Sequence, residues 1–416
     1  MASTPVALDD CPVTRAAIIS LHTSPLLQPG SGDSGGMNVY VRELVSALSQ
    51  AGIDCTTFTR ADRAGLPDSI EVEPGHRVVH IQAGPYHLPK EALADVADEF
   101  RRGVLQWYAD REHPHVIHGN YWLSGVVGHE LKHDLGVPFV STFHTLARVK
   151  AEGGDPEPEW RDRAEAEIIN CSDAVCVSCV EERDQFLRLY GRPDGEVAIV
   201  APGVEHAFFA PGSRAGARAA LGVDPDTPRV LFVGRIQPLK GPDVAIRALA
   251  AMRHDTAHLS IVGGASGRDG DDETDRAHRL VDELGLVERV EFVPPQPHHI
   301  LSTHYRAADV VIVPSRSESF GLVALEAAAC GTPVVAAAVG GLQSLVDDGE
   351  TGYLVHGRDP AAYAERIDRI VADPDLAGAM SAAAVARAST YTWRTAAQRL
   401  RWLYCQIIAT DLVDCD

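Results

Sequence analysis

The chain has 416 residues, more than one ordinary hydrophobic core organises, so two domains are expected. It carries 58 Asp and Glu against 37 Lys and Arg, a net charge of −21 with neutral His. This excess of negative charge argues against nucleic acid and anionic membranes as partners, and an anionic ligand would need a few local cations and backbone N–H groups to hold it.

The N-terminal residues include two acids and lack the apolar stretch of a signal peptide, and no later segment is apolar over the roughly 18 residues of a membrane span. A cytoplasmic protein without membrane insertion is therefore expected. The eight cysteines lie mostly in apolar runs, which predicts reduced structural thiols. Cys176 and Cys179 form a C-x-x-C, but a strand there would point them to opposite faces, so neither a zinc site nor a redox pair is indicated.

Short apolar runs rich in β-branched residues alternate with helical patterns along the whole chain. In the first half, strands are expected at 15–22, 54–60, 115–119, 138–144, 173–179 and 196–203. A helix is expected from about Met37, with Gly52 as its C-terminal stop. In the second half, strands are expected at 229–236, 257–264, 289–295, 309–315, 333–341 and 352–355. Two successive β-α series predict an α/β fold with two doubly wound sheets.

A stretch rich in Pro and Gly at residues 202–216 lacks regular periodicity, which predicts a linker between the two series. The first domain is therefore placed at 1–205 and the second at 206–391. An amphipathic helical stretch follows in residues 392–416.

A glycine-rich sequence, GSGDSGGMNVYV, places Gly35 and Gly36 between the first strand and a helix. Missing Cβ atoms allow a ligand to approach the backbone, and the N–H groups of the first helical turn suit an anion or a sugar hydroxyl. The loop lacks both G-x-G-x-x-G and the lysine of a phosphate-binding loop, so a purely structural turn stays open.

Cations able to hold an anion follow the first strand of the second series, in VLFVGRIQPLKGPDV. Arg235 and Lys240 could reach one diphosphate and offset the charge on a departing nucleotide, although two solvated loop cations are the alternative. Two acids, Glu318 and Glu326, favour the first interpretation. Glu326 lies inside an apolar helix and needs hydroxyl or N–H partners, which a ribose supplies, while Glu318 could hold sugar hydroxyls.

Together these segments resemble the retaining glycosyltransferases of family 4, whose E-x7-E element corresponds here to ESFGLVALE. The segments GGMNVYV, GRIQPLKGPDV, YRAADVVIVPS and EAAACGTPVVAAAVGGL extend the resemblance over nearly the whole chain. The resemblance implies the GT-B architecture, two facing Rossmann-like domains with a cleft between them. It places the acceptor in the domain at 1–205 and the donor nucleotide in the domain at 206–391, with a C-terminal helix in 392–416 crossing back to the first domain.

Four further segments, HTSPLLQPGSGDSGGMNVYV, AGPYHLPKEAL, NYWLSG and FHTLARVK, are similar to the mycothiol-pathway members of this family. Those members transfer N-acetylglucosamine from UDP-N-acetylglucosamine to 1L-myo-inositol 1-phosphate. The likeness implies an acceptor site made of Asn38, Lys90, Tyr121, Thr145 and Arg161. It implies catalytic roles for His144, Arg235, Lys240 and Glu318. It implies a donor site made of Gly35, Gly36, Arg235, Lys240, Gly264, Gln296, Glu318, Phe320, Gly321, Leu322 and Glu326.

The resemblance implies a nucleotide-diphosphate sugar as donor, with a UDP-sugar favoured and a GDP-sugar open, and neither a metal ion nor another cofactor is required. Retention of configuration is expected by front-face attack, in which the leaving phosphate oxygen helps to deprotonate the acceptor. The expected partners are the nucleotide sugar and a small acceptor, not nucleic acid, and a homodimer stays open.

Departures from the family pattern gather near the expected acceptor and base. Asn120 stands where a His is expected, Ser141 and Phe143 are additional differences, and Gln296 replaces an Arg. Another sugar phosphate, or a thiol as in lincosamide assembly, is therefore an alternative acceptor. A nucleotide-sugar epimerase or hydrolase and a non-catalytic sugar-nucleotide binder also stay open, whereas the absent G-x-G-x-x-G disfavours a nicotinamide dehydrogenase.

Overall fold

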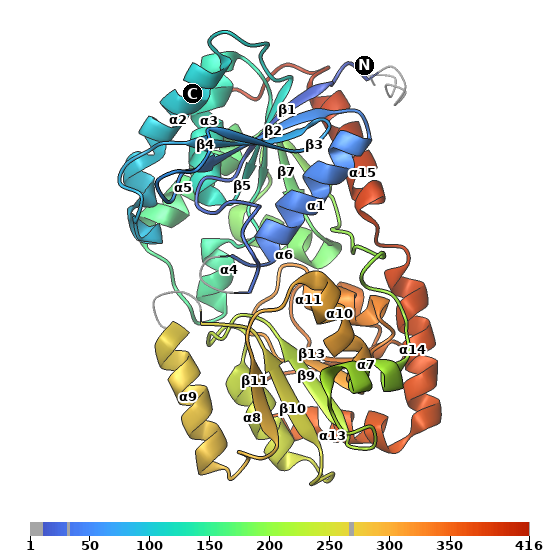
Figure 1. The fold of residues 1–416 in the computed structure, drawn as a ribbon. Helices are drawn as coiled ribbons and strands as arrows, with labels where there is room; N and C mark the ends of the chain where they lie inside the picture. Colours follow the sequence, from blue (N-terminus) through green and yellow to red (C-terminus); the bar gives the residue numbers. More distant parts are fainter. Residues whose placement is uncertain (1–10, 31–33, 266–269, 416) are drawn as a thin grey trace. The chain divides into compact units, whose positions relative to one another are not determined.

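The computed structural model describes residues 11–30, 34–265 and 270–415. They form two compact units, each with its own sheet (Figure 1). The first unit joins the chain up to Leu27 with Met37–Gly203 and with the segment that begins at Trp393. The second unit joins Gln28–Gly36 with Val204–Thr392. The glycine-rich loop therefore packs with the second unit, although the chain on both sides of it belongs to the first.

In the described part of the first unit, eight strands form one sheet in the order β3-β4-β2-β1-β5-β6-β7-β8. The strands are β1 (Arg15–Ile19), β2 (Asp54–Arg60), β3 (Ser69–Glu73), β4 (His76–Ile81), β5 (Val116–Asn120), β6 (Phe139–Thr142), β7 (Ala174–Val177) and β8 (Glu196–Ile199). Neighbouring strands are parallel except β3 and β4, which form an antiparallel hairpin at the edge. In register, Ile18 of β1 pairs with Thr57 of β2 and His118 of β5.

The helices of the first unit are α1 (Gly36–Gln50), the 3-10 helix η2 (Lys90–Val96), α2 (Ala97–Tyr108), α3 (Trp122–Leu135), α4 (Ala147–Glu152), α5 (Glu159–Cys171), α6 (Val180–Tyr190) and α15 (Trp393–Ile407). Alternate residues of β1 enter two separate cores because successive strand side chains point to opposite faces. Ala17 and Ile19 pack with residues of α2, α3 and α5, and Ala16 and Ile18 pack with residues of α1 and α15.

In the described part of the second unit, six parallel strands form a sheet in the order β11-β10-β9-β12-β13-β14. They are β9 (Arg229–Val233), β10 (His258–Val262), β11 (Val290–Val293), β12 (Val310–Val313), β13 (Val334–Ala337) and β14 (Gly352–Val355). The helices are α7 (Arg214–Leu221), α8 (Pro242–Ala251), α9 (Gly270–Glu283), α10 (His298–Ala307), α11 (Leu322–Ala329), α12 (Leu342–Leu345), α13 (Pro360–Ala372) and α14 (Pro374–Ala388). No described helix combines the length and apolarity that crossing a bilayer requires.

The predicted fold class is confirmed, because every expected strand is present and each unit is a doubly wound sheet. The sequence analysis missed the hairpin of β3 and β4. The prediction of reduced cysteines is wrong for two pairs, which form the disulfides Cys11–Cys405 and Cys171–Cys415. It holds for the buried thiols of Cys55, Cys176, Cys179 and Cys330. Apolar surroundings predict that a thiol is buried, but they do not reveal a partner hundreds of residues away.

Candidate active site

The loops where the strand order reverses are the natural ligand site of each sheet, because neighbouring connections diverge there beyond the carboxyl ends of the strands. In the second unit the reversal lies between β9 and β12. The loop after β9 carries Arg235 and Lys240, and the loop after β12 carries Glu318. The sheet topology therefore brings predicted catalytic residues from two distant segments to one edge.

Lys240 and Glu318 form an ion pair, with Lys240 Nζ 2.6 Å from Glu318 Oε2. Ser315 Oγ donates to the same carboxylate oxygen at 3.4 Å. Lys240 directly precedes Gly241, which caps α8 in a left-handed conformation, and Pro242 begins that helix with a favourable fixed φ. A carboxylate therefore compensates the charge of Lys240, and a phosphate group of a ligand would compete with Glu318 for the ammonium group.

The glycine pair Gly340-Gly341 after β13 fixes the loop that carries Glu318. Gly340 has a φ of +46°, and a Cβ on it would lie 1.9 Å from the carbonyl oxygen of Glu318. The N–H of Gly341 donates to that same oxygen at 3.0 Å. Any side chain at Gly340 would push the Glu318 loop away, so these glycines position the carboxylate.

The glycine corner that precedes α1 lies against the side chain of Arg235. A Cβ on Gly35 would lie 3.2 Å from Arg235 Nε, closer than most real Cβ contacts, whereas a Cβ on Gly36 would make only an ordinary contact with Leu322 at 3.5 Å. Because Gly35 has no side chain, the loop backbone can lie close to the guanidinium group of Arg235. Gly36 has no comparable steric requirement.

Glu326 is buried in α11, as the sequence analysis expected, and its polar partner is Tyr305 of α10. The Tyr305 hydroxyl donates to Glu326 Oε2 at 2.7 Å. Burial raises the pKa of Glu326 to about 7, and the Tyr305 hydrogen bond opposes that rise. Glu326 Oε1 has no hydrogen-bond partner among the described residues, so it can accept a ligand hydroxyl. Tyr305 was missed by the residue-level reasoning, although it lies in the quoted segment YRAADVVIVPS.

An open hollow of about 500 Å³ lies beyond β10 and β11, where Gly264 was predicted to bind the donor. Its lining includes Ile236, Phe292 and Pro295, an apolar set suited to a flat base. Gln296 follows directly, but its side-chain Nε2 donates to the carbonyl oxygen of Pro294 at 2.8 Å.

The other predicted donor residues surround the start of α11. Phe320 is buried against Tyr391, with ring centroids 5.8 Å apart. Gly321 caps α11 with a φ of 104°, and Leu322 begins the helix. The first N–H groups of α11 therefore follow Glu318 by only a few residues.

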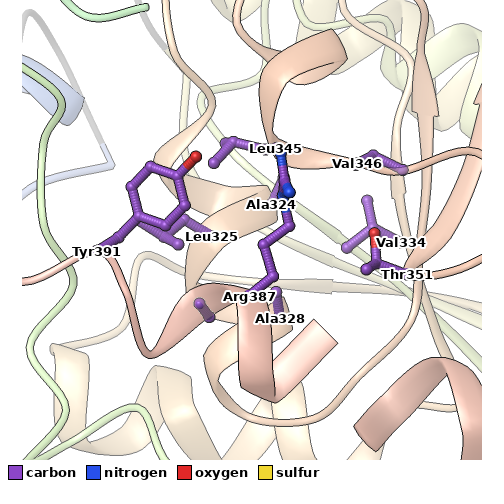
Figure 2. A pocket seen from close by; sticks show the side chains of 10 residues that line it. Ala324, Leu325, Ala328, Val334, Leu345, Val346, Thr351, Arg387 and Tyr391 are labelled. Carbon is purple, nitrogen blue, oxygen red and sulfur yellow. The ribbon is translucent and has the colours of Figure 1, made fainter. Parts of the chain in front are cut away.

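A separate cavity in the second unit is too small for a nucleotide. It has a volume of about 10 Å³, which is close to the space for one water molecule, and Figure 2 shows Arg387 and Tyr391 beside its apolar side chains. Arg387 is held by an ion pair of 2.8 Å with Asp347. This cavity belongs to the packing of α11 against α14.

In the first unit the strand order reverses between β1 and β5. The neighbouring loops contain two residues with an unusual backbone conformation. Tyr121, after β5, has a φ of 77°, and His144, after β6, has a φ of 59°. Among the described residues these are the non-glycine positions with positive φ. Such conformations cost on the order of 1–3 kcal/mol and tend to occur at functional sites.

Two cations lie over the ring of Tyr121. Lys90 Nζ is 4.6 Å and the Arg161 guanidinium carbon is 5.2 Å from the ring centroid. Arg161 also donates from Nη2 to Thr145, at 3.2 Å to the carbonyl oxygen and 3.3 Å to Oγ1. Four of the five predicted acceptor residues therefore form one cluster, which we call the Tyr121 cluster: Lys90, Tyr121, Thr145 and Arg161.

The two cations of the Tyr121 cluster differ in how their charges are compensated. Arg161 is buried and pairs with Glu157 at 2.7 Å and Glu165 at 2.8 Å. These carboxylates hold the guanidinium group in a fixed orientation. Lys90 is half-buried, and no carboxylate of the described residues lies within 4.0 Å of it. Lys90 is therefore the cation whose charge is open to an anion.

Asn38 is the fifth predicted acceptor residue, and it shapes the loop after β1. Its Nδ2 donates to Thr23 Oγ1 and to the Ser24 carbonyl oxygen, both at 2.8 Å. His22 directly precedes Thr23, and its ring centroid lies 4.5 Å from that of Tyr121. The loop that Asn38 holds therefore adjoins the Tyr121 cluster.

His144 contacts Asn120, one of the residues that depart from the family pattern. Its Nε2 lies 3.0 Å from Asn120 Oδ1, and its ring meets Tyr40 edge-on at a centroid distance of 4.8 Å. Burial, and then the neighbouring His118, lowers the pKa of His144 to about 3. His144 is therefore neutral near pH 7, which suits an orienting role and not that of a general acid.

Both units thus place cationic side chains where a Rossmann-like sheet reverses its strand order, and two such units define the GT-B class of glycosyltransferases. The model of the glycosyl transferase 4-like domain matches residues 35–203, and the model of glycosyl transferases group 1 matches residues 213–387. The chain belongs to the glycosyltransferases of family 4 and is an enzyme of that type.

Two relatives of similar length are both named D-inositol 3-phosphate glycosyltransferase. The D-inositol 3-phosphate glycosyltransferase of Frankia alni is 46% identical over 391 residues, covering 91% of this chain and 96% of the relative. The protein of that name from Acidothermus cellulolyticus is 46% identical over 408 residues, covering 95% of this chain and 91% of the relative.

Among solved structures, the sucrose-phosphate synthase of Thermosynechococcus elongatus is 37% identical with a TM-score of 0.89, covering 95% of this chain and 99% of that one. HepE of Anabaena, solved with UDP and glucose, has a TM-score of 0.75 at 21% identity, covering 93% and 98% of the two chains. The second likeness supports the fold alone.

Proposed function

We propose that the protein transfers N-acetylglucosamine from UDP-N-acetylglucosamine to an inositol phosphate, with retention of configuration. The observation that carries the proposal is the Tyr121 cluster, where Lys90 offers an uncompensated charge beside the fixed guanidinium group of Arg161. The relatives named D-inositol 3-phosphate glycosyltransferase support this acceptor. In a chain of net charge −21, such a local pair of cations is what an anionic acceptor needs. Because nucleotide sugars are made in the cytoplasm, we expect the enzyme to act there.

In the proposed acceptor complex, Lys90 and Arg161 contact the phosphate. Lys90 supplies a movable point charge and Arg161 a planar fork whose orientation Glu165 fixes. Tyr121 and Thr145 contact the ring or its phosphate, and Asn38 holds the adjoining loop. His144 helps to orient the donor sugar as a neutral imidazole.

In the proposed donor complex, Glu326 Oε1 accepts a ribose hydroxyl and the hollow beyond β10 takes the base. Arg235 and Lys240 contact the diphosphate, and Glu318 exchanges part of its contact with Lys240 for hydroxyls of the sugar. A UDP complex of HepE makes UDP the first nucleotide to test, with GDP as the alternative.

The proposed chemistry is a front-face displacement. The acceptor hydroxyl oxygen forms a bond to the anomeric carbon while the bond from that carbon to the β-phosphate oxygen breaks. The departing phosphate oxygen takes the hydroxyl proton, and Arg235 and Lys240 offset its charge.

A second candidate acceptor is a hexose phosphate, because the sucrose-phosphate synthase likeness extends over 95% of this chain at 37% identity. The product named there is a sugar phosphate, and the Tyr121 cluster would suit the phosphate of either acceptor. The two candidates differ in the ring that carries the phosphate, so a direct comparison of acceptors separates them.

An acceptor panel tests both candidates. Purified enzyme is given UDP-, GDP- or ADP-linked sugars with inositol 1-phosphate, inositol, fructose 6-phosphate or no acceptor, and NMR follows the product and its anomeric configuration. We expect a retained glycoside from UDP-N-acetylglucosamine and inositol 1-phosphate. Equal rates with inositol and inositol 1-phosphate would contradict the phosphate assignment, and rapid turnover without acceptor would favour a hydrolase or an epimerase.

The Lys90→Ala variant tests the acceptor residues directly. We expect KM for the phosphorylated acceptor to rise roughly 10- to 100-fold, because a hydrogen bond to a charged group contributes about 1.5–3 kcal/mol, while donor affinity stays unchanged. Arg102→Ala is a control, since it removes an exposed cation of α2 that pairs with Asp98. An unchanged acceptor KM in Lys90→Ala would remove the lysine from the site.

A further inference from the structure

Four side chains that commonly bind metal ions converge in the first unit at the edge opposite the candidate active site. His129 and His133 lie in α3, Cys171 ends α5, and Cys415 lies in the segment after α15. Their ligand atoms all lie within 4.8 Å of one another. Cys171 shortly precedes β7, which places the cluster where the parallel strands begin and the catalytic loops do not reach.

The spacing of His133 Nε2 from the two cysteine sulfurs fits tetrahedral zinc, and the sulfurs, which are joined in a disulfide here, would separate on reduction. His133 Nε2 lies 3.4 Å from Cys171 Sγ and 3.3 Å from Cys415 Sγ. Zinc–nitrogen and zinc–sulfur bonds of about 2.0 and 2.3 Å place the two ligand atoms of a tetrahedron about 3.5 Å apart. His129 and His133 are four residues apart, so they share one face of α3, and their ring centroids are 5.2 Å apart.

A buried network holds the segments that carry the four ligands. Lys132 Nζ, between the histidines in sequence, donates to the carbonyl oxygens of Cys171 and Val413, both at 2.8 Å. It also lies 3.1 Å from Asp173, whose Oδ1 accepts the N–H of Val413 at 2.7 Å. The C-terminal segment is therefore fixed beside Cys171 by contacts that do not depend on the cysteine sulfurs.

We propose that His129, His133, Cys171 and Cys415 bind one zinc ion in the reduced protein and so fasten the C-terminal segment to α3 and α5. The two cysteine thiols release their protons to solvent, the thiolates and two neutral imidazoles bind the ion, and the thiolate charges balance that of Zn²⁺. The disulfide between Cys171 and Cys415 is the metal-free alternative. Its formation removes two electrons and two protons to an oxidant such as a small-molecule disulfide, so zinc and disulfide exclude each other.

The full chain, purified without a histidine tag and kept reduced without chelator, tests this site. We expect about one zinc ion per chain by elemental analysis, and a Co²⁺-substituted protein with the visible bands of a tetrahedral site and a thiolate-to-cobalt charge-transfer band. Cys415→Ser should lose the ion and weaken the charge-transfer band. Because Cys415 lies in the terminal segment and is only partly buried, this variant should keep its circular dichroism spectrum.

A thiol control separates this site from adventitious binding. Cys179→Ser removes a cysteine outside the cluster, and serine can keep the helix-capping bond that Cys179 accepts from the N–H of Glu182. It should keep both the zinc ion and the cobalt spectrum, and a chelator should lower the melting temperature of this control and of the unmodified chain but not that of Cys415→Ser. A reduced chain that binds neither Zn²⁺ nor Co²⁺, or a Cys415→Ser variant with unchanged zinc content, would overturn the proposal.

Discussion

In the proposed reaction, the ammonium group of Lys240 must change its partner from the Glu318 carboxylate to the diphosphate of the donor. This ammonium group pairs with the Glu318 carboxylate at 2.6 Å, whereas the leaving group of the proposed reaction is a diphosphate of higher negative charge. The ammonium group can move from the carboxylate to the diphosphate because it is a point charge at the end of a flexible side chain. The pair therefore keeps the ammonium group in place until the donor arrives.

Replacing Lys240 by alanine should lower turnover on the order of 100-fold, since one preorganised donor to a developing anion contributes about that much. The measurement is the rate of nucleotide release at saturating donor and acceptor. Arg247→Ala, which removes an exposed cation of α8, should leave turnover unchanged. Turnover of Lys240→Ala within a few-fold of the unmodified enzyme would reject its role at the leaving group.

Glu326 should make donor binding depend on pH. Burial raises its pKa to about 7, so in the free enzyme the carboxyl is protonated below that value and is a poorer acceptor for ribose hydroxyls. The same rise means that Glu326 favours the folded state most at low pH, and that this contribution is lost as pH rises through about 7. Without ligand, stability therefore falls over the pH range in which donor affinity increases.

Titration calorimetry with a nucleotide sugar checks this dependence, because its diphosphate has no proton to lose near pH 7. We expect affinity to fall by up to about tenfold per pH unit below 7, and binding there to release a proton. The Glu326→Gln variant should bind more weakly at pH 8 and lose this slope. A steep slope that persists in Glu326→Gln would assign the titration to another group.

The sequence could identify the charged residues of the candidate site but not their partners. Lys240 and Glu318 stood out by charge type and by position after strands, and the sheet places both at one edge. Tyr305 did not stand out, because a tyrosine in an amphipathic helix usually belongs to the core. Its contact with Glu326 depends on how α10 packs beside α11, which no local pattern encodes.

At the scale of elements, α15 completes the core that α1 covers. Its Trp393, Leu400 and Leu403 are buried there, and the hydroxyl of Tyr404 lies 2.7 Å from His118 Nδ1. His118 is in the middle of β5, and its other nitrogen lies 2.7 Å from Thr142 Oγ1. A buried polar chain therefore connects the C-terminal helix to two strands of the sheet.

Tyr404→Phe should lower the free energy of unfolding by about 1–3 kcal/mol, because it leaves a buried nitrogen of His118 without its partner. Urea denaturation followed by circular dichroism measures the change. Tyr363→Phe is a matched control, since the Tyr363 hydroxyl makes only a long contact of 3.4 Å with the carbonyl oxygen of Gly357. Equal stability of the two variants would show that the Tyr404 contact contributes little.

The missed hairpin shows where element prediction fails. Buried parallel strands such as β12, VVIV, are continuous apolar runs and are easy to recognise. The edge strand β3, SIEVE, is mostly exposed and polar, so its apolar content is too low for the same criterion. The Pro74-Gly75 dipeptide before β4 was the available signal, because Pro-Gly marks a turn.

At the scale of the whole molecule, the proposed division of labour gives each unit one substrate. Hydrogen exchange tests this without reference to how the units are arranged. UDP alone should slow exchange in peptides of residues 28–36 and 204–392, and inositol 1-phosphate should slow it within residues 37–203. Protection by UDP confined to residues 37–203 would contradict the assignment of the donor to the second unit.

The path of the chain has a consequence for how the protein is made. The first unit receives its last helix from the segment that begins at Trp393, after the whole second unit has been synthesised. The ribosome therefore completes Val204–Thr392 before it synthesises α15. During that time the second unit can fold, while the apolar residues of the first unit that pack against α15 remain exposed. A chain that terminates before Trp393 would leave these apolar residues exposed to solvent. We therefore expect chaperones to bind such truncated products or proteases to degrade them.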